Sequence, residues 1–293
     1  MKLLLLGADG QLGAQLRVAL APLGDVHAPA SCDITDAGAL HATVAASGCD
    51  VIVNAAAYTA VDRAESDRDT AFAVNAVACE ALAREAKAAG AWLVHYSTDY
   101  VFDGSGTAAW RESDRPAPLG VYGASKLAGD EAIQRTWRQH VILRTSWVYE
   151  AGRDNFIAGI LTAAGLRDAL TVVDDQWGTP TRAATIAQAT AHIVARIQPA
   201  HAGLYHFASA GETNRFELAR YALQCAQARG WPLRATADTV QPIATAQVPS
   251  PAQRPLNSRL DCRHFDATFG FARPDWRADV RAAIEAWPAM PEG

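Results

Sequence analysis

Residues 2–13 read KLLLLGADGQLG, and this stretch decides the fold of the chain. Four leucines that end at a glycine predict a short buried strand, and the apolar spacing of residues 11–24 predicts a helix. Between the two, Gly7, Gly10 and Gly13 are spaced G-x-x-G-x-x-G. Glycines permit a tight turn and a close approach of the backbone to a pyrophosphate, while the helix start offers N–H groups to the anion. The stretch therefore predicts a dinucleotide-binding turn between a strand and a helix.

The first half of the chain continues this alternation of strands and helices. Short apolar runs predict strands, and alanine-rich stretches with glycine stops predict helices. The predicted strands cover residues 25–28, 50–58, 91–102 and 140–149, and the predicted helices cover residues 36–47, 69–90 and 122–137. Strands that alternate with helices form βαβ crossovers in a parallel sheet. The predicted fold class is α/β, a Rossmann-like doubly wound parallel sheet.

The regular alternation of strands and helices ends after about Tyr149. This change predicts a smaller C-terminal α/β substrate lobe. Helices are expected over residues 155–166, 181–197 and 214–230, strands over 171–181 and 203–209, and an extended loop over the proline-rich residues 241–260. The chain is expected to cross between the lobes more than once. The predicted dinucleotide-binding domain is 1–146 plus about 179–210, and the predicted substrate domain is about 147–178 plus 211–293.

Composition argues against several classes of protein. Of the 293 residues, 50% are hydrophobic and 19% are charged, so a large buried core is expected. The net charge is -5, whereas a general nucleic-acid binder usually carries a basic stripe. The first apolar run is shorter than the about 7–15 residues of a secretory signal, and no window approaches the roughly 18 of a membrane span. Five scattered cysteines without a C-x-x-C pair are typical of reduced thiols. We expect a cytoplasmic protein that binds neither nucleic acid nor membrane.

The residues after the second and third predicted strands bear on the cofactor. An acidic residue about 20 positions beyond the glycine turn normally holds the ribose 2′-hydroxyl of NAD(H). Here residues 25–31 read DVHAPAS, so the end of the predicted strand carries Ala28 and Ala30 but no carboxylate, and no arginine stands in its place. The sequence therefore favours NADP(H), or the use of both NADP(H) and NAD(H). The small residues 55–57 either let a cofactor lie flat on the backbone or serve close helix packing.

Tyr122 and Lys126 form the pattern Y-x-x-x-K on a predicted helix. A phenol with its ordinary pKa of about 10 exchanges protons poorly at neutral pH, and a nearby positive charge lowers that pKa. Residues i and i+4 share one helix face, so Lys126 is expected beside Tyr122, where it can also hold the nicotinamide ribose. A hydroxyl of Ser97 or Thr98 at the end of the preceding strand is expected to bind a substrate carbonyl. The set predicts reduction of a carbonyl that Thr98 polarises and Tyr122 protonates, with hydride from a nicotinamide.

Seven segments together resemble one family, the extended short-chain dehydrogenases/reductases. The segments are GADGQLG, VNAAAYTAVDRAE, STDYVFDG, YGASKLAGDE, RTSWVY, DDQWGTPT and RPLNSRLD, between residues 7 and 261. Within this family the chain is similar to the enzymes that reduce the 4-keto group of the sugar nucleotide dTDP-4-dehydro-L-rhamnose to dTDP-L-rhamnose, with NADPH or NADH.

The motifs and the resemblance together define a candidate site. The catalytic residues would be Thr98, Tyr122 and Lys126. The cofactor-binding residues would be Gly7, Gly10, Gln11, Leu12, Asp33, Ile34, Ala55, Ala56, Ala57, Tyr58, Tyr96, Tyr122 and Lys126, with Asp33 and Ile34 flanking the adenine. The substrate-binding residues would be Thr98, Asp99, Trp147, Arg254 and Asn257. For Arg254 and Asn257 the sequence leaves an ordinary loop role equally open.

The resemblance also brings alternatives. Related 4,6-dehydratases carry a glutamate where this chain has Tyr100, so elimination of water would lack its base here. A sugar-nucleotide 4-epimerase would use the same Tyr–Lys pair and stays open. A non-catalytic subunit, similar to the regulatory subunit of methionine adenosyltransferase, would be indicated by loss of the tyrosine, lysine or threonine, and all three are intact. Some family members dimerise through Mg²⁺ held by acidic side chains, but Gln15 stands at one such position here. We predict no metal, and a monomer or homodimer.

Overall fold

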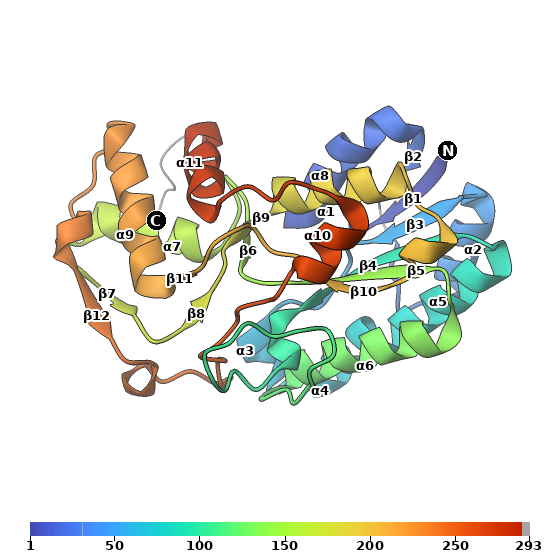
Figure 1. The fold of residues 1–293 in the computed structure, drawn as a ribbon, viewed down its shortest axis with the longest axis horizontal. Coiled ribbons are helices and arrows are strands. Elements are labelled where there is room, and N and C mark those ends of the chain that lie inside the picture. Colours follow the sequence, from blue (N-terminus) through green and yellow to red (C-terminus); the bar gives the residue numbers. More distant parts are fainter. Residues whose placement is uncertain (31, 289–293) are drawn as a thin grey trace.

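The computed structural model describes residues 1–30 and 32–288, which form two lobes (Figure 1). The last five residues of the predicted substrate domain, 289–293, lie outside the described residues. The larger lobe contains a six-stranded parallel sheet in the order β10-β5-β4-β3-β1-β2. Its strands are β1 (Lys2–Leu6), β2 (Asp25–His27), β3 (Val51–Asn54), β4 (Trp92–Thr98), β5 (His140–Thr145) and β10 (Gly203–His206). The predicted α/β class with a parallel sheet is confirmed.

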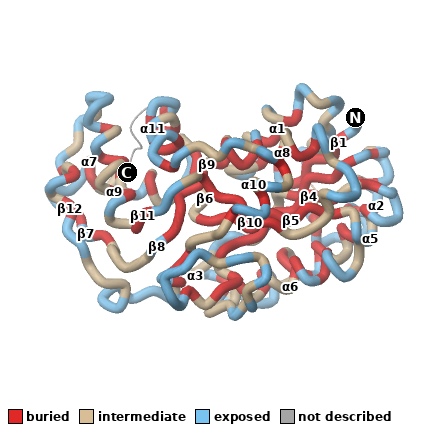
Figure 2. The backbone as a smooth tube through the Cα atoms, viewed as in Figure 1, coloured by how far each residue is buried: buried red, intermediate tan, exposed pale blue. Residues whose placement is uncertain are grey.

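Helices cover both faces of this sheet, because alternate residues of each strand point to opposite faces. Leu3 and Leu5 face one core, with residues of α1, α8 and α10, and Leu4 and Leu6 face a second core, with residues of α2, α5 and α6. Figure 2 shows the strands buried between the two helical layers. The helices of this lobe are α1 (Gln11–Leu20), α2 (Ala37–Ser47), α3 (Val61–Ala64), α4 (Arg68–Phe72), α5 (Ala78–Ala89), α6 (Val121–Thr136), α8 (Ala183–Val194) and α10 (Arg263–Phe269). Four consecutive leucines form β1 because a strand covered on both faces has no polar side.

The smaller lobe packs three helices against short paired strands. The helices are α7 (Phe156–Leu166), α9 (Arg215–Ala228) and α11 (Trp276–Ala286), and the strands are β6 (Val148–Tyr149), β7 (Leu170–Val173), β8 (Trp177–Gly178), β9 (Thr181–Arg182), β11 (Thr213–Asn214) and β12 (Val240–Ile243). β12 pairs with β7 and β9 with β6 in parallel, whereas β11 pairs with β8 antiparallel. Leu161, Leu218 and Val280 bring the three helices together in one core around Trp276.

Several local features differ from the predictions. The helix predicted over residues 69–90 is interrupted by a π-helical turn, Ala73–Val77, which points Asn75 inward. The Asn75 amide bonds both backbone groups of Tyr58 and the hydroxyl of Ser125, and these tertiary bonds compensate the irregular turn. The strand predicted over 140–149 breaks between β5 and β6.

Two further differences concern the C-terminal third. The first residues of the predicted loop 241–260 form β12, because β7 offers a partner that the local sequence does not reveal. The predicted substrate domain, about 147–178 plus 211–293, includes α10, but Phe265 and Phe269 of this helix pack into the core of the sheet lobe. Among the described residues, no helix is both long enough and apolar enough to cross a membrane.

Candidate active site

The turn between β1 and α1 is built from glycines that the surrounding backbone leaves no room to replace. Gly7 has a φ of +73°, and a Cβ on it would lie 2.5 Å from the backbone nitrogen of Ala56. A Cβ on Gly13 would overlap the carbonyl oxygen of Gly7. Gly10 caps α1 without a side-chain hydrogen bond, so the first N–H groups of the helix are left for an anion. This cradle fits the pyrophosphate of a dinucleotide.

A cleft of about 470 Å³ opens beside this turn, at the carboxyl ends of the strands and between the two lobes. Doubly wound sheets bind ligands at this edge, where the strand order reverses, and here it reverses between β1 and β3. The predicted residues that line the cleft are Gly10, Gln11, Leu12, Ala55, Ala57, Tyr96, Thr98, Asp99, Tyr122, Lys126 and Trp147. The structure therefore brings the glycine turn and the predicted catalytic residues into one space.

Lys126 is buried on the face of α6 that packs against β4. Its Nζ donates to the carbonyl oxygen of Tyr96 over 2.6 Å and lies 3.2 Å from Nε2 of His95. Burial raises the pKa of Tyr122, and the neighbouring Thr98 hydroxyl opposes this rise. The i, i+4 spacing predicts a lowered tyrosine pKa, whereas in the protein alone the removal of the phenol from water raises it.

Asp99 follows Thr98 at the end of β4 and is only 2% exposed. Its Oδ1 accepts a hydrogen bond from the Thr98 hydroxyl over 3.2 Å, whereas Oδ2 has no partner among the residues that the structure describes. Burial raises the pKa of this carboxyl from 3.8 to about 6, although the neighbouring Ser258 and Thr98 hydroxyls and, less strongly, the positive charge of Arg215 oppose the rise. A buried carboxylate with a free oxygen in a cleft is a candidate ligand for a sugar hydroxyl.

The raised pKa of Asp99 predicts that ionisation of this buried carboxyl lowers the free energy of unfolding as the pH rises. Stability that is present below the ordinary pKa of 3.8 is lost as the pH rises through about 6, because the unfolded chain ionises more easily. At about 1.4 kcal/mol for each pKa unit, the loss approaches about 3 kcal/mol. We expect Asp99→Asn to match the wild type near pH 4 and to be more stable by up to about 3 kcal/mol near pH 8 in urea unfolding. The exposed Asp69→Asn is the control, and a pH-independent difference would contradict the raised pKa.

Trp147 stands where the chain leaves β5 for the smaller lobe. Its φ of +48° lies in the left-handed region, which is strained for a bulky aromatic residue. The guanidinium carbon of Arg215 lies 3.8 Å from the centroid of the indole, and the ring of Phe156 covers the same guanidinium at 4.7 Å. A Cβ on Gly178 would lie 2.9 Å from the indole. The indole is therefore held rigidly as a wall of the cleft, where the prediction places a substrate contact.

Arg215 is a cleft residue that the sequence analysis missed. It is the first residue of α9, and it lines both the main cleft and an adjoining pocket of about 430 Å³. Burial lowers its pKa to about 10. Its partners Trp147 and Phe156 are distant in sequence, so no local pattern indicates the contact. A guanidinium at the junction of two pockets can bind an anionic group such as a diphosphate.

The remaining predicted cofactor residues do not line the cleft. Asp33 is exposed beyond β2, and Ile34 is buried in the core of the sheet lobe. Ala56 supports the glycine turn through its backbone, and the Tyr58 hydroxyl donates to Asp67 over 3.1 Å. Their contacts with a cofactor stay predictions.

The two substrate residues predicted in the proline-rich segment have different surroundings. Arg254 lines the adjoining pocket and forms an ion pair with Asp62 over 2.7 Å. Asn257 is buried, its amide nitrogen donates to two loop carbonyls, and its amide oxygen accepts from Arg259. Since its polar side-chain atoms are all used within the protein, the structure favours the ordinary loop role that the sequence left open for Asn257. Its contact with a substrate stays a prediction.

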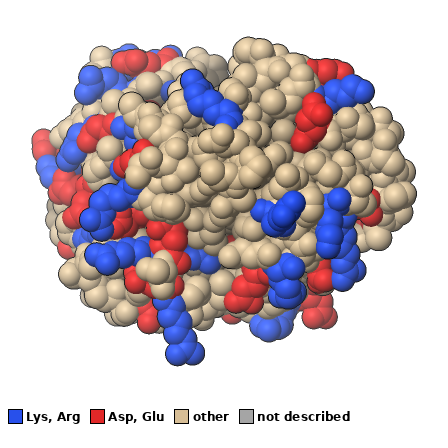
Figure 3. Space-filling view, turned by 45° about the vertical axis from the view of Figure 1, so that its right-hand side comes forward, with Lys and Arg blue, Asp and Glu red and all other residues tan. Residues whose placement is uncertain are grey.

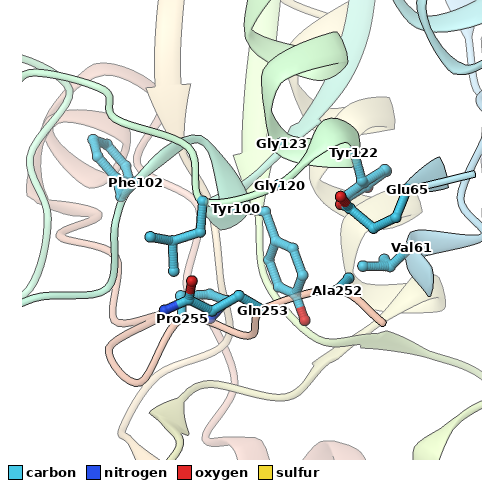
Figure 4. A pocket seen from close by; sticks show the side chains of 11 residues that line it. Val61, Glu65, Tyr100, Phe102, Gly120, Tyr122, Gly123, Ala252, Gln253 and Pro255 are labelled. Atoms are coloured by element: carbon cyan, nitrogen blue, oxygen red, sulfur yellow. The ribbon is translucent and has the colours of Figure 1, made fainter. Parts of the chain in front are cut away.

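Loops close against Tyr122 around a small pocket of about 10 Å³, roughly the room for one water (Figure 4). The ring of Tyr100 packs edge-on against that of Tyr122, with centroids 5.7 Å apart. Glu65 accepts a hydrogen bond from the backbone nitrogen of Val121, the first residue of α6. The start of α6, and with it Tyr122, is therefore anchored by segments distant in sequence.

The sequence predicts no metal site and no nucleic-acid partner. Within residues 1–30 and 32–288, no group of three or more His, Cys, Asp or Glu side chains is placed to hold a metal ion. On the face drawn in Figure 3, acidic and basic side chains are interspersed, and no extended basic stripe crosses it. The absence of a metal and of a nucleic-acid partner stays a prediction.

Comparisons with known proteins find relatives along almost the whole chain. A curated dTDP-4-dehydrorhamnose reductase of Escherichia coli K12 is 44% identical, over 97% of this chain and 97% of the relative. A relative of the same name from Mycobacterium tuberculosis H37Rv is 37% identical, over 97% of this chain and 93% of its own.

Solved structures of the same enzyme are similar in fold. A dTDP-4-dehydrorhamnose reductase from Clostridium acetobutylicum superposes with a TM-score of 0.90 at 30% identity, over 97% of this chain and 99% of that one. One from Bacillus anthracis, in complex with NADP, has a TM-score of 0.89 at 30% identity, over the same shares of the two chains. The family model described as RmlD substrate binding domain matches residues 1–288. The chain therefore belongs to the RmlD substrate binding domain family, together with the dTDP-4-dehydrorhamnose reductases that it resembles over nearly its whole length.

Proposed function

We propose that the chain is an NADP(H)-dependent oxidoreductase that reduces the 4-keto group of dTDP-4-dehydro-L-rhamnose to give dTDP-L-rhamnose. The observation that carries this proposal is the single cleft that joins the glycine turn to Thr98, Tyr122, Lys126 and Trp147. The names of the relatives support the substrate, and the NADP held by the Bacillus anthracis enzyme supports the cofactor. The cradle at Gly10 fits such a dinucleotide.

In the proposed mechanism, Tyr122 donates its phenolic proton to the O4 oxygen of the sugar. Its raised pKa keeps the phenol protonated at neutral pH, as a proton donor requires. The Thr98 hydroxyl accepts from the backbone N–H of Tyr100 and donates to Asp99 in the free protein. On substrate binding it would turn this single hydrogen from Asp99 to the same carbonyl oxygen and so polarise the carbonyl. Trp147 fixes the sugar ring from the opposite lobe. NADPH, when bound, supplies the hydride.

Turnover of dTDP-4-dehydro-L-rhamnose, measured in parallel with NADPH and NADH, tests this proposal. We expect oxidation of the reduced cofactor together with formation of dTDP-L-rhamnose. Epimerisation at C4 without net consumption of cofactor, with NAD retained through purification, would instead indicate the 4-epimerase. If the chain consumes no cofactor and alters no sugar nucleotide, the non-catalytic alternative holds.

Cofactor choice is tested at the end of β2, where the exposed Ala30 stands in place of a carboxylate. Ala30→Asp is expected to lower the ratio of kcat/KM for NADPH to that for NADH by at least about tenfold, or about 1.4 kcal/mol. The new charge would repel the 2′-phosphate of NADPH and accept a hydrogen bond from the 2′-hydroxyl of NADH. Ala30→Asn is the uncharged control, and a ratio that Ala30→Asp leaves unmoved would contradict the expected place of the ribose.

A further inference from the structure

The 148–155 segment, which runs from β6 to the start of α7, faces the glycine turn across the cleft. Val148 and Asn155, at its two ends, line the cleft together with Gln11, the first residue of α1. The segment belongs to the smaller lobe and the turn to the sheet lobe. Contacts between the two therefore connect the expected place of the cofactor with the lobe that carries the substrate.

The side-chain amide of Gln11 holds both ends of this segment. Its Oε1 accepts a hydrogen bond from Nδ2 of Asn155 over 3.2 Å, and its Nε2 donates to the carbonyl oxygen of Val148 over 3.2 Å. The backbone fixes the orientation of the Asn155 amide, because its Oδ1 accepts from the N–H of Ala158 and caps α7. Nδ2 of Asn155 therefore points at Gln11, and only the amide oxygen of Gln11 can accept from it.

Gln11 meets the expected cofactor site with its backbone and the smaller lobe with its side chain. Its backbone N–H is one of the first-turn groups that Gly10 leaves without a side-chain cap, where the pyrophosphate is expected. A second contact lies beside it, since Nη1 of Arg153 donates to the carbonyl oxygen of Asp9 over 3.3 Å. A ligand fixed on the turn thus also fixes the residues that hold the 148–155 segment.

The segment reaches the wall of the cleft at both of its ends. Trp147 directly precedes Val148, and Phe156 directly follows Asn155. The indole of Trp147 and the ring of Phe156 both contact the guanidinium of Arg215. The firmness with which the segment is held therefore decides how firmly the indole is held where the sugar is expected to lie.

In the free protein the hold of Gln11 on the segment is weak. Nδ2 of Asn155 has two hydrogens but three acceptors within reach. These are the carbonyl oxygens of Glu150 at 2.8 Å and Arg153 at 2.9 Å, and Oε1 of Gln11 at 3.2 Å. The bond to Gln11 is the longest of the three. A ligand that immobilises Gln11 removes part of the entropy that this bond costs, so it strengthens the bond.

We propose that Gln11 is a positioning residue that couples the two ligand sites of the cleft. A dinucleotide on the glycine turn makes the 148–155 segment more rigid and thereby tightens the site for the sugar nucleotide beside Trp147. The sugar nucleotide has to favour dinucleotide binding by the same factor, because coupling between two binding sites is reciprocal. The identity of the two ligands rests on the proposed function, whereas the link between the turn and the segment does not.

Amide hydrogen exchange tests this link without the sugar nucleotide. The probe is 2′-phospho-ADP-ribose, which carries the pyrophosphate of NADP⁺ but no nicotinamide that could touch the segment itself. At saturation it is expected to slow exchange in wild-type peptides that cover residues 7–14 and 148–158. In the second peptide the slowing should be at least about fivefold, the lower end of the usual coupling between sites.

Gln11→Leu removes the side-chain amide but keeps the backbone N–H groups of the turn. The probe should therefore still protect residues 7–14 of this variant, whereas the protection of 148–158 should fall below about twofold. Protection of 7–14 shows within the same experiment that the probe is bound. Gln227→Leu, the same substitution at an exposed position of α9, is the matched control and should behave like the wild type.

The coupling itself is measured as the Kd of dTDP-L-rhamnose with and without saturating 2′-phospho-ADP-ribose. The probe is expected to lower this Kd at least about fivefold in the wild type and less than about twofold in Gln11→Leu. A purely structural role of Gln11 would weaken binding equally in both conditions and leave the ratio of the two Kd values unchanged.

Three outcomes would overturn the proposal. They are a wild type in which the probe protects residues 7–14 but not 148–158, full protection of 148–158 in Gln11→Leu, and an unchanged Kd ratio in that variant. The first is read from the wild type, so it decides even if Gln11→Leu does not fold. Asn155→Ser then replaces that variant, because serine retains an oxygen that caps α7 but is too short to reach Gln11.

Failure of the proposed function gives a different result. A chain whose residues 148–158 respond to the probe through Gln11, but which does not bind dTDP-L-rhamnose, would refute the proposed function and leave the link between turn and segment standing. Turnover of the sugar nucleotide by a chain whose 148–158 segment does not respond would refute this inference alone.

Discussion

Tyr122→Phe is expected to lower kcat for the reduction of dTDP-4-dehydro-L-rhamnose by about 10²–10⁴-fold, the usual contribution of a positioned general acid. The phenylalanine ring can keep the edge-on packing against Tyr100, so the fold and the cofactor affinity should be retained. The loss should therefore fall on kcat, with KM for NADPH changed little. Steady-state turnover and cofactor titration of the variant measure the two effects separately.

Tyr100→Phe is the matched control for this prediction. Tyr100 lines the same cleft and touches the ring of Tyr122, but it has no proton to deliver in the proposed mechanism. Removal of the Tyr100 hydroxyl should lower kcat by less than about tenfold, which is below the usual contribution of a general acid. Equal losses in the two variants would show that a shared packing effect, and not proton donation by Tyr122, accounts for the result.

Arg144→Met is expected to lower the free energy of unfolding by about 3–5 kcal/mol, the cost of leaving a buried charge without its partner. Asp130 has no exposed side-chain area, and its Oδ2 accepts from Arg144 over 3.0 Å and from the Ser97 hydroxyl over 2.8 Å. Burial already raises the pKa of Asp130, and Arg144 is the main group that opposes this. Urea unfolding near neutral pH measures the loss.

Two variants show whether this loss of stability comes from the Asp130 carboxylate that is left without its partner. Arg144→Met combined with Asp130→Leu removes both charges and should recover much of the stability, because an apolar pair can replace a buried ion pair at little cost. Arg84→Met breaks an exposed pair with Glu80 and should cost no more than about 1 kcal/mol. A loss in Arg144→Met as small as that of Arg84→Met would mean that Asp130 is not held as a buried charge.

The sheet and much of the cleft could be predicted because their signals are local. The leucine run and the glycine turn depend on neighbours within a dozen residues, and strands in a parallel sheet end at one edge. Thr98, Asp99 and Tyr122 therefore fall at the cleft once the strand and helix boundaries are approximately right. Even the interrupted helix at residues 73–77 does not change which edge of the sheet the cleft occupies.

What could not be predicted depends on contacts between distant segments. Arg215 lines the cleft only because α9 packs beside Trp147. Asn257 does not line it, because the amide nitrogen of Asn257 donates to loop carbonyls. The spacing of Tyr122 and Lys126 fixes their helix face correctly. It contains no information on His95, whose Nε2 reaches within 3.2 Å of the same lysine from β4.

The close fit of Trp147 against Gly178 has a consequence for how this family can vary. Position 178 cannot gain a side chain while the indole is in place, since the first added carbon would already lie 2.9 Å from it. Only a lineage that has given up the tryptophan is free to replace the glycine. The two positions should therefore covary among relatives, and a larger residue at 178 would mark an enzyme that has rebuilt this wall of its cleft for a different sugar.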